Sequence, residues 1–374
     1  MPTSIIFGVL LHDADEKWLG RNQLMLALST HTNVVLLEQP RFTSRWVEFR
    51  KPRPEQIGEN LFVIRDAFGL RYQRLGKRLK KLTAPVDAKW FHEALQQIGI
   101  TDYIYWLTVN DPAMALGIPD DRLVYDCMDP NFFPEQQKKF DKNEAALASR
   151  ARLVFCSAHT LHRKMLNVNP KAFLLPNATS KDTIRAVQAK EYDLPTPLQG
   201  RNRPFIGYMG TIDWRFDAKY VYEAAKTLTE YTFILVGRIN SDQEVNVRPL
   251  RDLPNVILTG QASYEEGHAY NLAFDVGLIP FTPGPMNDAI NSVKMFMYLA
   301  GGKPVVATDV EECRLNPFVL TADTPQTFAK AIRQVVTGNN LVDVQSRIDF
   351  ASANTWEHRA EDAIEHLKMA GMYH

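Results

Sequence analysis

Short apolar runs recur along this chain, and stretches of helical period separate them. Such runs, rich in Val, Ile and Leu and not alternating with polar residues, are typical of strands buried on both faces of a parallel sheet. Stretches such as Lys219–Thr227 and Thr327–Thr337 carry apolar residues at helical spacing. This repetition predicts an α/β fold with parallel sheets. The expected strands are Ile5–Leu11, Val34–Glu38, Leu61–Ile64, Tyr103–Leu107, Leu123–Tyr125, Leu153–Cys156, Phe173–Leu175, Pro204–Tyr208, Thr232–Val236, Val256–Leu258, Val276–Ile279 and Pro304–Ala307.

A turn-rich gap divides the chain. Its 374 residues exceed the roughly 250–300 at which a single core stops growing, so two domains are expected. Residues 178–203 are rich in turn formers and contain no long apolar run. We therefore expect domains over residues 1–180 and 200–355, followed by a terminal helix over residues 356–374. Two doubly wound domains would place a ligand cleft at the carboxyl ends of their strands.

Composition excludes several classes of protein. The chain has 43 Lys and Arg against 43 Asp and Glu, and this zero net charge argues against a nucleic-acid partner. The three cysteines Cys127, Cys156 and Cys313 are odd in number and widely spaced, which fits neither a disulfide framework nor a zinc site. No apolar run approaches the roughly 18 residues of a membrane helix. A reduced, cytoplasmic protein is expected.

One local charge cluster stands apart from this balance. The stretch Arg71–Lys81 contains six basic residues and no acidic one. It is interpreted either as a patch that contacts an anionic membrane surface from the inner face, or as the solvated side of a helix or loop. Gly76 within it weakens any helix.

The second half carries a pattern that fits a phosphate site. Gly207 and Gly210 lie at the end of an expected strand, where glycine lets the backbone approach a phosphate closely. Arg238 follows the next strand. Asn291 and Ser292 are good helix caps, and Lys294 comes in the first turn after them. A cation beside a helix N-terminus suits a diphosphate, although each element alone is also a generic strand–turn–helix connection.

These motifs resemble the glycosyltransferases of the GT-B type, which have two Rossmann-like domains. The chain is most similar to bacterial envelope and exopolysaccharide enzymes, of the teichuronic-acid and xanthan glucuronosyltransferase types. The resemblance covers most of the chain. It rests on Gly207-Tyr-Met-Gly210, Val236-Gly-Arg238, Ala273–Pro280, Asn291-x-x-Lys294 and Tyr298–Val306 in the second half, and on Trp18-x-x-Arg21-x-Gln23, Leu36–Pro40, Leu123–Asp129, Val154–Ser157 and Leu175–Asn177 in the first.

The resemblance implies a division of labour between the domains. The second domain would bind a nucleotide-sugar, expected to be a UDP-sugar, and the first a glycan or lipid-linked glycan acceptor. The two would face each other across a cleft, with the C-terminal helix returning to the first domain. No cofactor and no metal is expected. The implied donor-binding residues are Gly210, Thr211, Arg238, Asn291, Ser292, Lys294 and Tyr298, and the implied acceptor-binding residues are Trp18 and Arg21.

An inverting transfer needs a base that takes the proton of the acceptor hydroxyl. Asp129 follows an expected strand and precedes Pro130, and xanthan-type enzymes imply an aspartate base in this domain. Asp129 is therefore the expected base; a helix cap is its plain alternative, and Asp126 competes with it. His12, after the first strand, is the second candidate, since some inverting relatives place a histidine there.

Two alternatives to an inverting transferase stay open. Retaining relatives hold the donor ribose with a glutamate where this chain has Met297. Methionine cannot accept hydrogen bonds from hydroxyls with useful strength, so this position counts against the retaining group. A retaining transferase that uses another residue is one alternative. A catalytically silent nucleotide-binding subunit of a polysaccharide assembly complex is the other.

Overall fold

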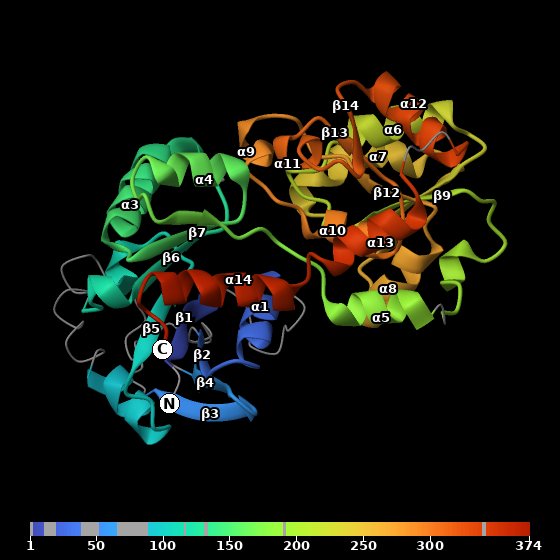
Figure 1. The fold of residues 1–374 in the computed structure, drawn as a ribbon. Coiled ribbons are helices and arrows are strands. Elements are labelled where there is room, and N and C mark those ends of the chain that lie inside the picture. The colour runs from blue at the N-terminus through green and yellow to red at the C-terminus, as the bar shows by residue number, and fades with distance from the viewer. Residues whose placement is uncertain are drawn as a thin grey trace. The chain divides into compact units, whose positions relative to one another are not determined.

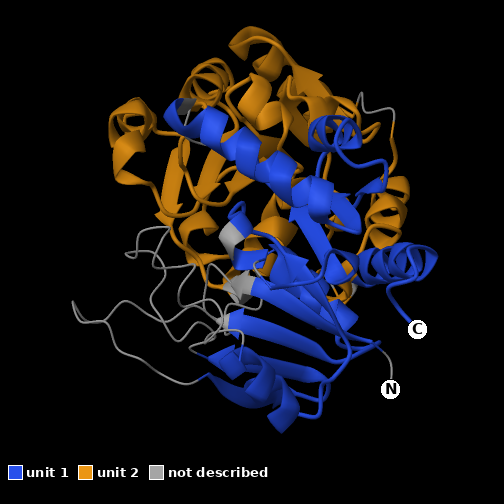
Figure 2. Ribbon diagram, turned by 90° about the vertical axis from the view of Figure 1, so that its left-hand side faces the viewer, with its two compact units in different colours: residues 1–176, 357–374 blue, residues 177–356 orange. Residues whose placement is uncertain are grey.

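A computed structural model shows two compact units, each built on one sheet. It describes residues 3–10, 20–38, 52–65, 89–115, 117–130, 134–189, 192–338 and 342–374. Unit 1 comprises Met1–Pro176 and Glu357–His374, and unit 2 comprises Asn177–Trp356 (Figure 2). Residues 177–180, which the sequence analysis assigned to the first domain, and the unassigned segment 181–199 thus belong to unit 2.

The sheet of unit 1 has the strand order β3-β4-β2-β1-β5-β6-β7-β8, and every neighbouring pair is parallel except β3 with β4. Its central strands β5, β6 and β7 are buried along their whole length, as expected of strands covered on both faces. The bounds are β1 Ser4–Leu10, β2 Val34–Glu38, β3 Arg53–Gly58, β4 Leu61–Arg65, β5 Tyr103–Leu107, β6 Leu123–Cys127, β7 Leu153–Cys156 and β8 Ala172–Leu174, with helices α1 Gly20–Leu28, α3 Gln137–Arg150, α4 His159–Leu166 and α14 Trp356–Met369.

The sheet of unit 2 is parallel throughout, in the order β11-β10-β9-β12-β13-β14. Its strands are β9 Phe205–Met209, β10 Thr232–Val236, β11 Val256–Gly260, β12 Val276–Ile279, β13 Val305–Thr308 and β14 Val319–Ala322. Its helices are α5 Lys181–Ala189, α6 Ala218–Thr227, α7 Glu244–Arg251, α8 Tyr264–Ala273, α9 Pro285–Asp288, α10 Val293–Ala300, α11 Glu311–Arg314, α12 Pro325–Val336 and α13 Val344–Ser352 (Figure 1).

Both sheets have a point at which the strand order reverses. In unit 1 the chain builds outward from β1 through β2 and then returns to place β5 on the other side of β1. In unit 2 it builds from β9 through β10 and β11 and returns to place β12 beside β9. In open parallel sheets, ligands bind at the carboxyl ends of the strands at such a reversal.

The C-terminal helix α14 packs with unit 1, as the sequence analysis expected. The Arg152 guanidinium, just before β7, donates hydrogen bonds to the Ala370 carbonyl at 3.0 and 3.1 Å. The ring of His366 on α14 stacks on that of Phe173 in β8, with centroids 4.0 Å apart. Unit 1 is therefore assembled from the two ends of the chain.

Candidate donor site in unit 2

The residues that the sequence analysis singled out for a diphosphate come together where the strand order of unit 2 reverses. Gly210 directly follows β9, and Phe281 lies two residues beyond the end of β12. Lys294, on the first turn of α10, reaches between them, with its ammonium 5.5 Å from the ring centroids of both Tyr208 and Phe281. Two aromatic faces thus hold the cation at the carboxyl edge of the sheet.

Gly210 is the residue that lets the lysine lie there. Its φ of 142° falls in a region that side chains other than glycine rarely adopt. A Cβ atom at this position would lie 2.3 Å from Cε and 2.7 Å from Nζ of Lys294. The glycine at the strand end therefore makes room for the cation next to the backbone.

The ammonium of Lys294 is a charge with little compensation. It makes no hydrogen bond or ion pair with any residue that the structure describes. Burial lowers the pKa of Lys294 to about 8; the positive charge of Arg215 lowers it further, and the negative charge of Asp213 opposes both. A desolvated cation without an anionic partner among the described residues favours an anionic ligand.

An ion pair that the sequence analysis did not place in the site lies in the segment after Gly210. The Arg215 Nε donates to Asp213 Oδ1 at 2.9 Å, and the Arg215 Nη2 contacts Asp213 Oδ2. Burial opposes ionisation of Asp213, but the hydrogen bonds and charge of Arg215 outweigh it and lower the pKa of this carboxyl. The signal in the sequence was the Asp-x-Arg spacing three residues after the glycine.

The remaining implied donor residues differ in their surroundings. Tyr298 is fully buried, and its hydroxyl accepts a hydrogen bond from the Met209 amide at 2.8 Å, so it supports the end of β9 from behind. Thr211 accepts a hydrogen bond on its carbonyl from the Tyr208 hydroxyl at 2.8 Å. Arg238 follows β10 and is exposed, with its carbonyl bound by the Ile212 amide.

Asn291 and Ser292 precede α10. The Asn291 side chain is buried; its Nδ2 donates to Glu312 Oε2 at 2.7 Å, and its Oδ1 accepts from the Asn177 amide at 3.1 Å. Ser292 is the N-cap residue of α10, but its side chain makes no capping hydrogen bond. The first amides of this helix, including that of Lys294, are therefore not capped by that side chain, and such amides attract anions. The Met297 carbonyl accepts from the Asn271 side chain at 2.8 Å.

In unit 1 the structure separates the two aspartates that competed for the role of base. Asp126, within β6, is fully buried; its Oδ1 accepts from Arg21 Nη2 at 3.0 Å and its Oδ2 from Trp106 Nε1 at 2.9 Å. Asp129, two residues beyond the strand, is exposed. Arg21 is buried in this pair rather than displayed at the surface. His12, Trp18 and the basic stretch Arg71–Lys81 lie outside the described residues.

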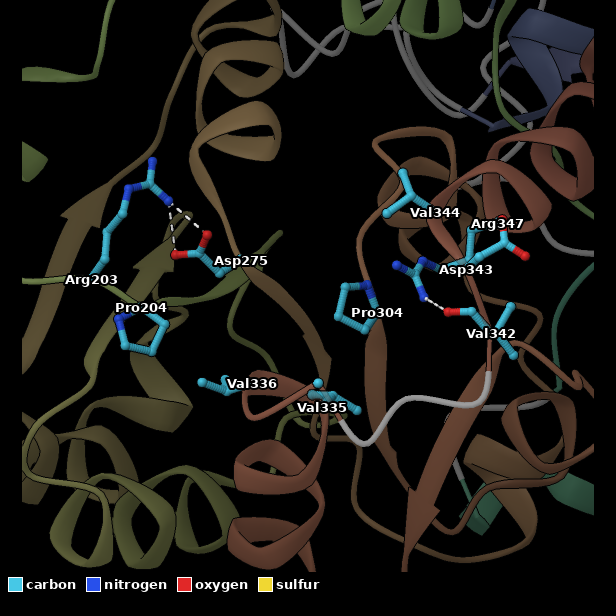
Figure 3. A pocket seen from close by; sticks show the side chains of 11 residues that line it. Arg203, Pro204, Asp275, Pro304, Val335, Val336, Val342, Asp343, Val344 and Arg347 are labelled. Carbon is cyan, nitrogen blue, oxygen red and sulfur yellow. Dashed lines mark hydrogen bonds and ion pairs between the residues drawn. The ribbon is translucent and has the colours of Figure 1, made fainter.

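A hollow of about 710 Å³ in unit 2 lies away from these residues (Figure 3). Pro204, Asp275 and Pro304 in its lining precede β9, β12 and β13, so it opens at the amino edge of the sheet. Within it Arg203 Nη1 binds both carboxylate oxygens of Asp275, at 2.7 and 2.8 Å. Ligands of open parallel sheets bind at the opposite edge, so the hollow does not lie where a ligand of this fold is expected.

The described residues also address the expectations on metal ions, membrane helices and cysteines. No group of three or more His, Cys, Asp or Glu side chains in the described ranges could hold a metal ion. Among the helices that the structure describes, none is both long enough and apolar enough to cross a membrane. All three cysteines are buried and free.

Comparison with known proteins places these features in a family context. Residues 203–338 match the model of a family described as glycosyl transferases group 1. A curated relative, the teichuronic acid biosynthesis glycosyltransferase TuaH of Bacillus subtilis, is 31% identical over 239 residues, covering 59% of this chain and 59% of the relative. The match thus spans about three fifths of that relative's length. The similarity to bacterial envelope glycosyltransferases is thereby confirmed.

Solved structures share the fold over nearly the whole chain. Sucrose-phosphate synthase from Thermosynechococcus elongatus superposes with a TM-score of 0.69 at 16% identity, covering 98% of both chains. The Anabaena protein HepE, solved in complex with UDP, gives a TM-score of 0.67 at 15% identity, covering 99% of this chain and 100% of that one. The expected fold, two Rossmann-like domains of the GT-B type with a returning C-terminal helix, is confirmed.

Proposed function

We propose that this chain transfers a sugar from a nucleotide-sugar, a UDP-sugar, to a hydroxyl group of a glycan or lipid-linked glycan acceptor. The observation that carries the proposal is the Lys294 ammonium, held against Gly210 at the strand reversal of unit 2 with no anionic partner among the described residues. A diphosphate would supply the negative charge that the Lys294 ammonium lacks. In sugar transfer the nucleoside diphosphate is the leaving group. A fixed cation and helix amides can balance the negative charge that develops on it.

The similarities support the same class of reaction. The family model spans Gly210, Arg238 and Lys294, and the fold neighbour HepE was solved with UDP and, separately, with UDP-glucose. Teichuronic acid biosynthesis, named for the curated relative, favours an acceptor of the bacterial cell envelope. We assign the chain to the cytoplasm, with contact to the inner membrane surface through residues 71–81 as an added expectation.

Asp129 is the proposed base. It lies at the carboxyl edge of the unit 1 sheet and is exposed, whereas Asp126 is sealed in an ion pair with Arg21. An exposed carboxylate can take the proton of an acceptor hydroxyl while the hydroxyl oxygen attacks the anomeric carbon and the nucleoside diphosphate departs. Direct attack inverts the configuration at that carbon. A product with retained configuration would instead favour the retaining alternative.

Nucleotide binding tests the proposal first. Thermal unfolding of the full chain is followed with UDP, GDP, ADP, CMP and dTDP, each with magnesium and with EDTA. A nucleotide at about 100 times its Kd stabilises by about 2.7 kcal/mol, or roughly 5–10 °C for domains of this size. We expect UDP to raise the midpoint equally in magnesium and in EDTA, and Lys294→Met to abolish the rise.

The matched control is Lys226→Ala, which removes an exposed lysine of the same unit and should leave the UDP response unchanged. A chain that no nucleotide stabilises would contradict the proposal. A chain that binds UDP but turns over no donor would be the silent assembly subunit.

A further inference from the structure

The hollow at the amino edge of the unit 2 sheet, called the amino-edge hollow below, has largely apolar walls. Its volume of about 710 Å³ lies within the roughly 300–1,000 Å³ that small-molecule pockets occupy. Two prolines before strands, two valines at the end of α12 and two valines around the start of α13 form its apolar lining: Pro204, Pro304, Val335, Val336, Val342 and Val344 (Figure 3). Such walls favour a ligand with an apolar body.

One charged side chain of the lining is buried. Arg347, on the first turn of α13, is 5% exposed. Its Nε donates to the Gly302 carbonyl at 2.8 Å and its Nη1 to the Val342 carbonyl at 2.7 Å. Its third nitrogen, Nη2, makes no hydrogen bond or ion pair with any residue in the described ranges. In Figure 3 the guanidinium points away from α13 toward the side of the hollow that Pro304 lines.

Neither aspartate of the lining pairs with this guanidinium. Asp275 is held by Arg203, whose Nη1 binds both of its carboxylate oxygens. Asp343 accepts from the Ser346 amide at 2.9 Å and from the Ser346 hydroxyl at 2.6 Å. Burial lowers the pKa of Arg347, and the charge of Asp343 opposes this only in part. Arg347 is therefore a buried charge whose hydrogen bonds go to neutral carbonyls, an arrangement that an anionic ligand would stabilise.

We propose that the amino-edge hollow binds a small aliphatic carboxylate, with its carboxylate group on Arg347 Nη2 and its hydrocarbon body against the valines and prolines. The donors of a guanidinium match carboxylate oxygens. A carboxylate fits better than a phosphate dianion because Asp343 places a negative charge in the same lining. The site lies at the edge of the sheet opposite Gly210 and Lys294, so this inference goes beyond the proposed function and does not depend on it.

Ligand-observed NMR titrations of the full chain at neutral pH test the proposal. The probes are hexanoate, hexanol, acetate and hexyl phosphate. We expect hexanoate to bind saturably at one site. Hexanol lacks the charge and should bind about tenfold more weakly or worse. Acetate lacks the apolar body and should also bind about tenfold more weakly or worse. Hexyl phosphate should bind more weakly than hexanoate.

Two substitutions locate the site. Arg347→Gln removes the cation and should weaken hexanoate binding about tenfold or more. Val336→Phe leaves Arg347 in place and puts a larger side chain into the half-buried lining, so it should weaken binding as well. This second variant decides the matter if Arg347→Gln does not fold.

Two controls separate the hollow from the rest of unit 2. Arg333→Gln removes an exposed guanidinium of α12 that does not line the hollow, and Lys294→Met changes the proposed donor site. Both should bind hexanoate as the wild type does. A control that weakens binding as much as Arg347→Gln would overturn the inference.

Three results with the wild-type chain would also overturn it. The first is that hexanoate does not bind saturably, and the second is that hexanol binds as tightly as hexanoate. The third is that hexyl phosphate binds more tightly than hexanoate, which would make the ligand a phosphate. Wild-type hexanoate affinity in both Arg347→Gln and Val336→Phe would place the binding elsewhere.

Discussion

At the scale of single residues, burial gives Lys294 its chemistry. Packing between Tyr208 and Phe281 lowers the pKa of Lys294 to about 8, so the free site loses its ammonium charge in mildly alkaline solution. An anionic ligand binds the protonated form and raises this pKa again. UDP affinity should therefore be constant below pH 7 to 8 and fall by up to about tenfold per pH unit above 8.

Isothermal titration between pH 6.5 and 9.5 measures this dependence. The phosphate groups of UDP are already ionised above pH 7, so they do not produce the fall. Lys294→Arg, whose guanidinium stays charged, should bind with a flat profile over the same range. If the UDP affinity of the wild type does not change up to pH 9.5, the lowered pKa of Lys294 is contradicted.

Residue types were easier to predict than residue surroundings. Gly210 and Lys294 are marked by their positions after a strand and at a helix start, and the structure brings them into contact. Asp126 and Asp129 both come just after the expected strand Leu123–Tyr125, and the sequence does not indicate which of them is the base. Only the tertiary contacts with Arg21 and Trp106 bury Asp126, and these residues lie 105 and 20 positions before it in the chain.

At the scale of elements, the packing of α10 against the sheet determines the shape of the proposed donor site. A Cβ atom on Gly277 in β12 would lie 2.4 Å from the ring of Tyr298, whose hydroxyl supports the end of β9 through the Met209 amide. Gly277→Ala should therefore displace this ring. Overpacking of this kind costs about 1–3 kcal/mol, and UDP affinity should fall because Met209 precedes Gly210.

Denaturant unfolding and UDP titration measure the two effects. The matched control is Gly267→Ala on α8, where a Cβ atom meets only Met209 Sδ at 3.4 Å. A helical glycine replaced by alanine gains up to about 1 kcal/mol, so this variant should be as stable as the wild type or more so. Equal losses in both variants would mean that any added methyl group disturbs unit 2.

The strands that the sequence analysis missed are edge strands. β3, with the sequence Arg-Pro-Glu-Gln-Ile-Gly, is mostly exposed and pairs antiparallel with β4 alone. β14 is half-buried and closes the far side of the unit 2 sheet. An edge strand pairs on one side only and needs no continuous apolar run, so apolar content does not reveal it.

At the scale of the whole molecule, the proposed reaction divides between the two units. Asp129→Asn should lower kcat by about 10²–10⁴-fold, the contribution of a general base, and leave UDP affinity unchanged because Lys294 belongs to unit 2. Lys294→Met should impair both. Turnover is measured as UDP release from UDP-sugars with an envelope glycan extract as acceptor, and the configuration of the product is read by NMR.

The control for this prediction is Asp121→Asn, an exposed carboxylate before β6, which should behave like the wild type. Full activity in Asp129→Asn would mean that another group acts as the base. Loss of UDP binding in the same variant would mean that Asp129 acts on folding rather than on the acceptor.

The sequence by itself determined the layered architecture. The periodicity of its hydrophobic residues and the apolar content of its segments indicate which are strands covered on both faces and which are helices between them. It also singled out Gly210 and Lys294 together, a glycine at a strand end and a lysine at a helix start, and the structure brings the two into contact. Tertiary structure alone decided that Asp126 is buried and pairs with Arg21 while Asp129 stays exposed, and that Arg152 binds the Ala370 carbonyl beyond α14. These features depend on contacts between segments that are separated in the chain. Local sequence patterns do not indicate which distant residue a side chain contacts.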